Sequence, residues 1–463
     1  MAPQNRNISL HREGGIISPA DTAKEQIRPM IKNPSADIAR IKRMIKDKKS
    51  VYIRTFGCQM NVADSLVMKS ILSDRGFEFT GNLEDAALII FNSCSIRDHA
   101  ENRMFSNLGL AMKKNPSAGF ILAGCTAKRH GSKLFKRFPR LGAVSAPSEI
   151  FSIGEIAEKV IGGGMGIEAL AGGVYGFVPR VGDISEYVVI QTGCDNYCSY
   201  CVVPFLREGE KYRSAGDILR EAECLAASGT KEIVFLGQNV NSYRDENEGD
   251  DFPALLRRAS EIEGILRIRF LTSHPKDLSP KLIEEFKRNP KLAHHLHLPV
   301  QSGSDSVLKR MNRKYTSGDY LKILERLRES VPDIALTADI IAGFPGETDK
   351  DFSKTLGLVR KADFDGVFVF KYSPREGTES YKMNDDVKEP AKKERLTAGL
   401  ALAKELALKK RKAYIGKKVE ALFENDDVGH SSQNYLVFKK GAKAGEFGEV
   451  VIKGVSGFRL MAE

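Results

Sequence analysis

The sequence predicts an α/β protein of three domains: an N-terminal parallel-sheet domain, a central partial (β/α) barrel and a small C-terminal β-barrel. Two observations predict the N-terminal and central domains. Short apolar, β-rich runs alternate with helical stretches in two series, and a glycine-rich segment at 162–173 separates the series. A third observation predicts the last domain, because residues 412–463 contain only strand-like runs divided by Gly, Asn and Asp turns.

The composition narrows the class of protein. The chain has 463 residues, 42% of them hydrophobic, which is enough to bury a core and excludes a wholly disordered protein. It has no run of about 18 apolar residues and no apolar secretory signal, so we expect a cytoplasmic protein without a membrane partner. Seven cysteines, an odd number without an export signal, favour metal or redox chemistry over disulfides.

The first predicted parts are an arm and a domain. Residues 1–49 are expected to be an extended arm, because four prolines interrupt them, with one short basic helix around 37–48. The N-terminal domain is predicted at 50–165, where the runs VYIRTFG, ALIIFNS and GFILAG are each followed by a helical stretch. This pattern is typical of βαβ units with a parallel sheet. The glycine-rich segment after Ile161 is expected to be a flexible linker.

The central domain, predicted at 180–411, repeats the strand–helix pattern six times. Its candidate strands are EYVVIQ, EIVFLG, ILRIRFL, HHLHLPV, IALTADII and GVFVFKY. The pattern indicates a partial or complete (β/α) barrel, although periodicity alone does not distinguish a barrel from an open sheet. A long charged helix at 390–412 follows. The predicted C-terminal barrel has the candidate strands KKVEALFE, NYLVFKK, GEVVIKGV and FRLMAE, and barrels of this kind often bind nucleic acid.

The charge balance favours an anionic partner. Lys and Arg total 71 against 60 Asp and Glu, a net charge of +11, and the excess lies at 1–50 and 51–165 around a neutral central block. Candidate RNA phosphate contacts are Lys404, Lys409, Lys410, Arg411 and Lys412 at a helix end and Lys417, Lys418, Lys439, Lys440 and Lys443 in the tail. A solvated helix end and a tail that only caps the structure are the alternatives.

The strongest motif is a CxxxCxxC made by Cys194, Cys198 and Cys201, in the loop after the first strand of the central domain. Three thiolates so closely spaced can hold three irons of a cubane cluster and leave the fourth iron open to a chelating ligand. A structural zinc site is a weaker alternative, because it needs four ligands and no fourth lies nearby.

Three dispersed cysteines form a second candidate site. Cys58, Cys94 and Cys125 each follow one of the three strands of the N-terminal domain, and the carboxyl ends of parallel strands meet at one edge of a sheet. If each cysteine is considered alone, a role as a small buried apolar residue is a simpler explanation than a role as a metal ligand. Taken together, they predict a second metal or Fe–S site with three protein ligands. Cys224 lies within a helical pattern and is expected only to pack in the core.

From residue 50 to the end, the chain resembles the radical S-adenosylmethionine (SAM) methylthiotransferases. The resemblance is carried by TFGCQMNVADS, FNSCSIRDHAENRMFSNLG, AGCTAKRHG, GCDNYCSYCVVPFLREGEKYRS, LGQNVNSY, HLPVQSGSDSVLKRMNR and DIIAGFPGET, in the family's order. The tail resembles a TRAM domain, an RNA-binding β-barrel. GCQMN and NSCSIRDHA are similar to the tRNA-modifying MiaB type rather than to the branches that act on a ribosomal protein or on threonylcarbamoyl-adenosine.

The resemblance implies an activity: methylthiolation at C2 of N6-isopentenyladenosine at position 37, next to the tRNA anticodon, with two [4Fe-4S] clusters and two SAM molecules. It implies that Cys194, Cys198 and Cys201 (the SAM triad) hold the cluster that cleaves SAM. Cys58, Cys94 and Cys125 (the auxiliary triad) would hold the cluster that relays sulfur. The implied partners are a tRNA anticodon stem–loop, a low-potential electron donor such as flavodoxin or ferredoxin, and a sulfur donor.

The expected SAM contacts follow three strands of the central domain. They are Gly237, Gln238 and Asn239 after the second strand, His297 and Gln301 around the fourth, and Gly343, Gly346 and Glu347 after the fifth. For each glycine, a turn that needs a positive φ is an equal alternative. For His297, a core or hydrogen-bonding role is the simpler interpretation.

The chain departs from the family motif R-G-x-E-x-S-R at two positions. Arg207, Glu210 and Arg213 match it, but Glu208 stands where glycine is usual and Tyr212 where serine is usual. We expect these two residues to affect the geometry of the loop or the approach of RNA, and not the reaction class. Two alternatives remain: a methylthiotransferase acting on another modified adenosine or on a ribosomal protein, and a non-catalytic Fe–S or zinc RNA-binding protein.

Overall fold

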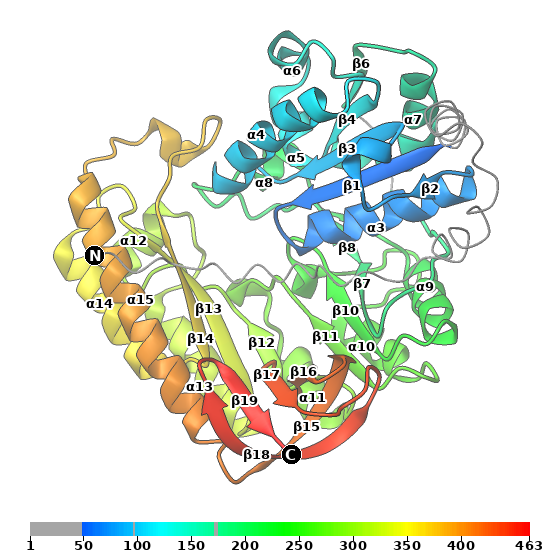
Figure 1. The fold of residues 1–463 in the computed structure, drawn as a ribbon. Helices are drawn as coiled ribbons and strands as arrows, with labels where there is room; N and C mark the ends of the chain where they lie inside the picture. The colour runs from blue at the N-terminus through cyan, green and yellow to red at the C-terminus, as the bar shows by residue number, and fades with distance from the viewer. Residues whose placement is uncertain (1–48, 96–97, 171–174) are drawn as a thin grey trace.

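The computed structural model describes residues 49–95, 98–170 and 175–463, and the expected arm with its basic helix lies outside them. Figure 1 shows the N-terminal domain (blue to cyan) lying over one side of the central domain (green to yellow), with the C-terminal barrel (red) at the opposite end of the central domain. The predicted fold class is confirmed by this arrangement of two α/β units and a closed β-barrel.

The N-terminal domain contains a six-stranded parallel sheet in the order β2-β1-β3-β4-β5-β6. The strands are β1 (Ser50–Phe56), β2 (Glu78–Phe79), β3 (Leu88–Ser93), β4 (Gly119–Ala123), β5 (Ala143–Ser145) and β6 (Ile167–Ala169). The helices are α3 (Gln59–Asp74), α4 (Asp98–Lys114), α5 (Cys125–His130), α6 (Lys133–Arg137) and α7 (Ile153–Ile161). Every residue of β3 is buried, as expected for a parallel strand covered on both faces.

Two apolar cores cover the two faces of this sheet. On one face, residues of α3 and α7 pack against Leu88 and Ile90. On the other face, residues of α4 and α6 pack against Ile89 and Phe91. Part of the glycine-rich segment that we expected to be a linker forms β6 instead, and it extends the sheet by pairing with β5.

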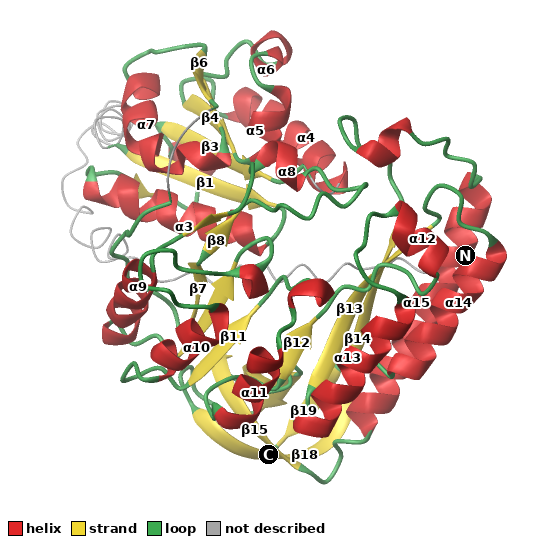
Figure 2. Ribbon diagram, turned by 180° about the vertical axis from the view of Figure 1, so that it is seen from behind, coloured by secondary structure: helices red, strands yellow, loops and turns green. Residues whose placement is uncertain are grey.

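The central domain is an open half-barrel, which decides between the predicted alternatives (Figure 2). Its two parallel sheets, β11-β10-β7 and β12-β13-β14, are linked by a bridge between Ile268 and Leu292, and no pairing joins β14 to β7 in the described chain. The strands are β7 (Ser185–Val189), β10 (Glu232–Leu236), β11 (Arg267–Phe270), β12 (His295–His297), β13 (Ala335–Ala342) and β14 (Gly366–Lys371). A short antiparallel pair, β8 (Gln191–Thr192) and β9 (Lys211–Tyr212), lies beside the SAM triad loop.

Helices cover the outer face of the half-barrel and share one apolar core with its strands. They are α9 (Ala215–Ala227), α10 (Phe252–Ser260), α11 (Pro280–Arg288), α13 (Ser317–Ser330), α14 (Asp349–Ala362) and α15 (Glu389–Lys412). Two short helices, α8 (Val203–Leu206) and α12 (Asp305–Arg310), lie outside this core, because Leu206 packs with Cys125 and Val307 packs with Phe344. Capping boxes at Thr316 and Thr348 fix the starts of α13 and α14, because each threonine accepts a backbone N–H that would otherwise lack a partner.

The C-terminal barrel closes in the order β15-β16-β17-β19-β18. Its strands are β15 (Lys418–Asn425), β16 (Val428–Ser431), β17 (Leu436–Lys439), β18 (Phe447–Ser456) and β19 (Arg459–Ala462). It docks where β10 and β11 begin: Arg267 donates to the carbonyl of His430 at 2.8 Å, and Arg269 donates to that of Ser431 at 3.2 Å. The barrel therefore covers the amino ends of the strands, opposite the loops that carry the cysteines.

No helix within the described residues is both long enough and apolar enough to cross a bilayer.

Candidate cluster and SAM sites

The auxiliary triad lies at the carboxyl edge of three adjacent strands. Cys58 follows β1 and caps α3, Cys94 follows β3, and Cys125 begins α5 after β4. The backbone N–H of Cys94 donates to the carbonyl of Phe56 at 2.9 Å, which fixes the end of β3 beside the end of β1. The structure thus brings these three cysteines together although they are far apart in the sequence.

Two glycines allow this close approach. Gly57 has a φ of +137°, and a Cβ added there would lie 2.3 Å from the Cβ of Cys94. Gly124 has a φ of +90°, and its Cβ would lie 2.4 Å from Oδ1 of Asn92. Side chains at either position would push the strand ends apart, so glycine is required beside the thiols.

A buried ion pair joins the auxiliary triad to the central domain. Arg207, in the loop after the SAM triad, has Nη2 2.6 Å from Oδ2 of Asp64 on α3, and both side chains are almost fully buried. A hydrogen bond with Cys94 lowers the pKa of Cys58 to about 6, with the charge of Arg207 acting in the same direction. Burial raises the pKa of Cys125, and the Arg207 charge opposes this effect.

The SAM triad lies in the loop between β8 and α8. The N–H of Cys194 donates to the carbonyl of Glu208 at 3.2 Å, and the N–H of Cys201 donates to that of Cys198 at 2.9 Å. Nη1 of Arg313, from the segment after α12, donates to Sγ of Cys198 at 3.3 Å. Burial raises the pKa of Cys194 and raises that of Cys201 to about 12.

The two triads are neighbours. Cys125 packs in one apolar cluster with Val202 and Leu206, and Val202 is the residue directly after Cys201. Helix α5, which Cys125 begins, contacts α8, which follows Cys201. A substrate held between the triads would therefore be within reach of both.

The donor chemistry of each triad fits an iron–sulfur cluster. Among the described residues, no three His, Cys, Asp or Glu side chains converge closely enough to hold one metal ion. Ligands of a single zinc ion converge on a point about 2.0–2.3 Å from each donor atom, whereas three thiolates on a cubane bind three different irons. Each triad supplies three free cysteines, which is the ligand type and number that the second arrangement uses.

The expected SAM residues after β10 support the SAM triad loop. Oε1 of Gln238 accepts from the N–H of Gly193 at 2.6 Å, next to Cys194. Oε1 of Gln191 accepts from the N–H groups of Gln238 and Asn239, at 2.8 and 3.1 Å. A Cβ on Gly237 would lie 2.5 Å from Oε1 of Gln191 and 3.1 Å from the Gln191 carbonyl oxygen, so glycine allows this close packing. Gln238 and Gly237 thus have a structural role in the described chain.

The residues after β13 form a separate network. Oε2 of Glu347 accepts from the N–H of Gly343 at 2.7 Å and pairs with Nη1 of Arg395 at 2.9 Å. A Cβ on Gly343 would lie 2.4 Å from the Lys392 side chain, and Gly346 has a φ of +75°. Both glycine positions thus agree with the turn alternative, and Glu347 stabilises this turn.

The remaining candidates face the interior of the half-barrel or its edge. Nδ1 of His297 is hydrogen-bonded to Oγ1 of Thr337 at 2.9 Å, and Nε2 of His297 lies 3.5 Å from Oδ2 of Asp339. Gln301 pairs with β13 and has a φ of +70°. Cys224 lies on α9, half-buried and apart from both triads, so it is less deeply packed than expected.

Unmatched polar atoms mark where SAM would fit. Oδ1 of Asn239, Oγ of Ser273 and Oε1 of Gln301 are buried and have no hydrogen-bond partner among the described residues. Buried polar groups are nearly always hydrogen-bonded, so a polar ligand is the natural partner for atoms left unmatched at the carboxyl edge. The amino acid and nucleoside parts of SAM carry such groups.

The two departures from the family motif keep the loop intact. Glu208 adopts a φ of +67°, the left-handed conformation that glycine takes most easily, and its carboxylate pairs with Lys211 at 2.9 Å and Lys128 at 3.7 Å. The hydroxyl of Tyr212 donates to Glu210. The loop geometry thus tolerates both side chains.

Three functional candidates were not predicted as site residues: Arg207, Arg313 and Gln191. Arg207 matches the family motif, but no local spacing connects it to Asp64, which is 143 positions away. Arg313 lies 115 positions from Cys198. Only the folded chain reveals these contacts.

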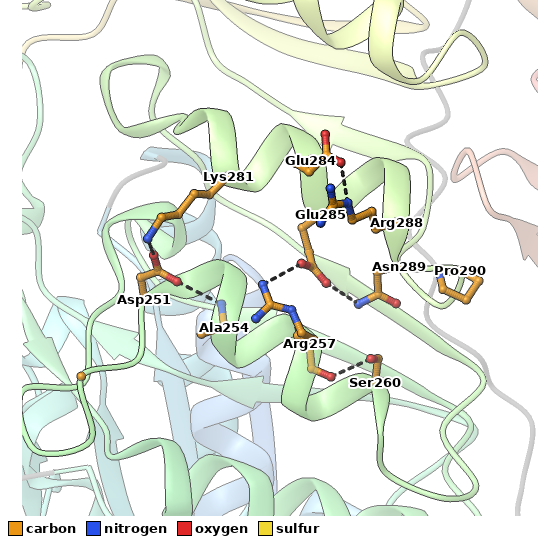
Figure 3. Close-up of a pocket in the computed structure, with 11 residues that line it drawn as sticks. Asp251, Ala254, Arg257, Ser260, Lys281, Glu284, Glu285, Arg288, Asn289 and Pro290 are labelled. Atoms are coloured by element: carbon orange, nitrogen blue, oxygen red, sulfur yellow. Dashed lines mark hydrogen bonds and ion pairs between the residues drawn. The ribbon is translucent and has the colours of Figure 1, made fainter.

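A hollow on the outer helices is a different feature. A cavity of about 830 Å³ lies between α10 and α11 (Figure 3). Its charged side chains pair with one another, with Lys281 2.9 Å from Asp251 and Arg257 3.3 Å from Glu285. It contains none of the cysteines or expected SAM contacts, so it is not the candidate site.

The class of protein follows from comparison with protein families. Residues 188–359, which carry the SAM triad, match the radical SAM superfamily, so the central domain is that of a radical SAM protein. Residues 50–145, which carry the auxiliary triad, match the uncharacterized protein family UPF0004.

The particular family follows from full-length relatives. The chain is 42% identical to the tRNA-2-methylthio-N(6)-dimethylallyladenosine synthase of Thermodesulfovibrio yellowstonii, over 87% of this chain and 96% of the relative. It is 39% identical to the synthase of the same name from Clostridium perfringens strain SM101, over 90% of this chain and 98% of the relative. The chain belongs to this family of synthases, the MiaB type of the radical SAM methylthiotransferases, which confirms the resemblance.

Solved structures agree on the fold. The radical S-adenosylmethionine methyltransferase TsrM from Kitasatospora setae is 14% identical, with a TM-score of 0.52 over 70% of this chain and 72% of that chain. The cobalamin-dependent S-adenosylmethionine radical enzyme OxsB gives a TM-score of 0.51 at 12% identity, over 76% of this chain and 56% of that chain. At these identities the likeness concerns the fold alone.

Proposed function

We infer that the protein is a radical SAM methylthiotransferase that modifies C2 of N6-isopentenyladenosine at position 37 of tRNA. The family supports the reaction and the tRNA substrate. One observation of the structure carries the inference: two cysteine triads lie next to each other, linked through Cys125 and Val202 and braced by the Arg207–Asp64 pair. A single radical SAM reaction needs only one triad, so the second supports sulfur insertion.

The chain's own residues position the reactants. We assign the SAM triad, with Asn239 and Gln301 beside it, to SAM, because their unmatched polar atoms suit its amino acid and nucleoside groups. When bound, the two clusters supply the electron that cleaves SAM and the sulfur that is transferred. Cys94 and Cys125 are buried and the other four cysteines are half-buried, so the chain shields part of the space in which a carbon radical would form from water. The target base leaves the anticodon loop to enter this space, as single-stranded loops permit.

The finer partners are also proposals. A low-potential electron donor such as flavodoxin or ferredoxin and a separate sulfur donor are required by the chemistry, because the chain supplies neither low-potential electrons nor a sulfur source. A cytoplasmic location, where tRNA is modified, stays a prediction.

A reconstitution assay tests the function. The chain is loaded with iron and sulfide under anaerobic conditions, then given SAM, a reductant and an anticodon stem–loop that carries the isopentenyl group. Mass spectrometry of the nucleosides should show the 2-methylthio derivative, and the same stem–loop without the isopentenyl group should react poorly. Reaction of a ribosomal protein or a different modified adenosine, with no product on the isopentenylated stem–loop, would contradict the inference.

A further inference from the structure

We propose that the outer side of α4 and α6 binds the phosphate backbone of the tRNA anticodon stem. We call this surface the basic face and define it as Arg103, Lys113, Lys114, Lys133, Lys136 and Arg137. The proposal rests on the proposed function and names where the substrate is held outside the reacting base.

The sequence around the basic face is uniformly positive. Residues 102–148 contain nine Lys and Arg residues and no Asp or Glu, although acidic residues are nearly as frequent as basic ones in the whole chain. A surface that carries only positive charges attracts a polyanion, and the counterions of the polyanion are released when it binds.

The cations of the basic face are exposed and unpaired. Arg103, Lys113, Lys114, Lys133 and Lys136 are exposed, and none has a carboxylate within ion-pair distance among the described residues. The basic residues closer to the triads are paired instead: Arg129 lies 3.3 Å from Glu101, and Lys128 lies 3.7 Å from Glu208. The free cations therefore lie on the outer side of the domain.

Aromatic contacts make the basic face one continuous surface. The guanidinium of Arg137 lies 4.0 Å from the centre of the Phe105 ring on α4. Phe105 also stacks on Phe138, directly after α6, with ring centres 5.9 Å apart. Both views show α4, α5 and α6 together at one side of the N-terminal domain (Figures 1 and 2).

Four of the ten cations expected from the sequence to bind RNA pair with carboxylates, whereas four others, Lys404, Lys409, Lys412 and Lys440, are exposed and have no ion pair among the described residues. In the tail, Lys418 pairs with Glu449 at 3.1 Å and Lys439 with Glu446 at 2.8 Å. At the end of α15, Lys410 pairs with Asp363 at 2.6 Å. A phosphate contact at these sites would have to displace a carboxylate, which costs part of the attraction it provides.

Arg411 is engaged in a different way. It donates to the carbonyl of Phe458 at 3.0 Å and lies over the ring of Tyr435, so it holds the barrel in place. The barrel itself docks at the amino ends of β10 and β11, opposite the triads. The barrel and the end of α15 thus lie at the end of the central domain that is opposite the triads.

The basic face starts close to the reaction site. Helix α5 begins at Cys125 and ends at His130, and α6 begins at Lys133. Six helical residues span about 9 Å. A loop whose base lies between the triads would therefore bring the adjoining stem to α6. Double-stranded RNA is bound mainly through its shape and phosphates, which suits a face of free cations.

Paired substitutions on the reconstituted enzyme test the basic face. The first variant is Lys133→Gln/Lys136→Gln on α6, and the second is Lys113→Gln/Lys114→Gln on α4, which avoids the Arg137 contact with Phe105. The control is Lys287→Gln/Lys361→Gln, which removes two exposed cations of α11 and α14 that have no ion pair within the described parts of the chain. Fluorescence anisotropy measures binding of the isopentenylated stem–loop and of the loop sequence alone across a salt series.

The expected result is specific to the stem. Each face variant should bind the stem–loop about tenfold more weakly at roughly 0.15 M salt, and its salt slope should fall by about one per lost contact. Binding of the loop alone, SAM cleavage with dithionite and the melting temperature should stay as in the unchanged chain. The control should bind both RNAs like the unchanged chain.

Two results would overturn the proposal. One is a stem–loop affinity and salt slope in both face variants equal to those of the control. The other is unchanged RNA binding with a loss of flavodoxin-driven SAM cleavage, which would assign the face to an acidic electron donor. If the proposed function is wrong, a different result is expected: the unchanged chain makes no 2-methylthio product. The RNA affinities of the variants would still show whether the basic face binds RNA.

Discussion

At the scale of single residues, buried arginines link the candidate cluster sites to the rest of the fold. Arg207 joins Asp64 to the surroundings of the auxiliary triad, and Arg313 donates to the sulfur of Cys198. Hydrogen bonds to cluster sulfurs and nearby charge both influence reduction potentials. The sequence predicted the cysteines because each follows a strand or forms a tight motif, but it did not predict these arginines, whose partners are more than a hundred positions away.

One residue-scale prediction concerns pH. Burial raises the pKa of Glu347 to about 7, against the N–H of Gly343 and the charge of Arg395, from a usual value of 4.5. The folded chain then holds a proton that the unfolded chain releases, so this group's contribution to stability is full below about pH 4.5 and is lost as the pH rises through about 7. The loss amounts to at most about 3 kcal/mol.

Glu347→Gln removes the titrating group but keeps an oxygen that can accept from Gly343 and Arg395. The free energy of unfolding, from urea titrations at pH 5 and pH 8, should therefore fall less with pH in the variant than in the unchanged chain. An equal fall in both proteins would show that Glu347 does not titrate in this range.

At the scale of elements, the C-terminal barrel is held by a buried charge network. Arg267 begins β11 and is fully buried; it pairs with Glu232 and, at 3.2 Å, with Glu424 of the barrel. Burial alone would raise the pKa of Glu232, but the charges of Arg267 and Arg269 lower it to about 2. The network thus fastens the barrel to the amino ends of the strands.

Removing one partner should loosen this element. Arg267→Met leaves buried carboxylates without their main partner, which costs about 3–5 kcal/mol. We expect a lower melting temperature and faster proteolysis between α15 and β15. The matched control is Arg257→Met, because the side chain of Arg257 is 64% exposed and its pair with Glu285 should contribute less than about 1 kcal/mol. Equal effects of the two substitutions would contradict the role of Arg267.

Long elements were predicted better than short ones. The apolar runs of β3, β4 and β10 are visible in the sequence because nearly all their residues are buried. Strands β6 and β16 are among those that the sequence did not predict, since β6 lies in a glycine-rich segment and β16, with the sequence VGHS, has only one apolar residue. Pairing with β5 forms the first, and pairing with β15 and β17 the second, so neighbours decide these strands more than local propensity does.

At the scale of the whole molecule, the N-terminal domain and the half-barrel meet where their strands end. Helix α3 packs against β7 and β10 through Met60 and Ala63, which places the auxiliary triad beside the SAM triad. The period of the sequence could not decide between an open and a closed barrel, because closure depends on pairing between strands far apart in the chain. The structure shows the open form.

The central claim is that the two triads perform separate steps of one reaction. Single substitutions Cys58→Ala and Cys198→Ala test it in the reconstituted enzyme, with 5′-deoxyadenosine and 2-methylthio nucleoside measured in the same reaction. We predict that Cys58→Ala still releases 5′-deoxyadenosine but makes no methylthio product, and that Cys198→Ala makes neither. Methylthio product from Cys58→Ala, or SAM cleavage by Cys198→Ala, would contradict the account.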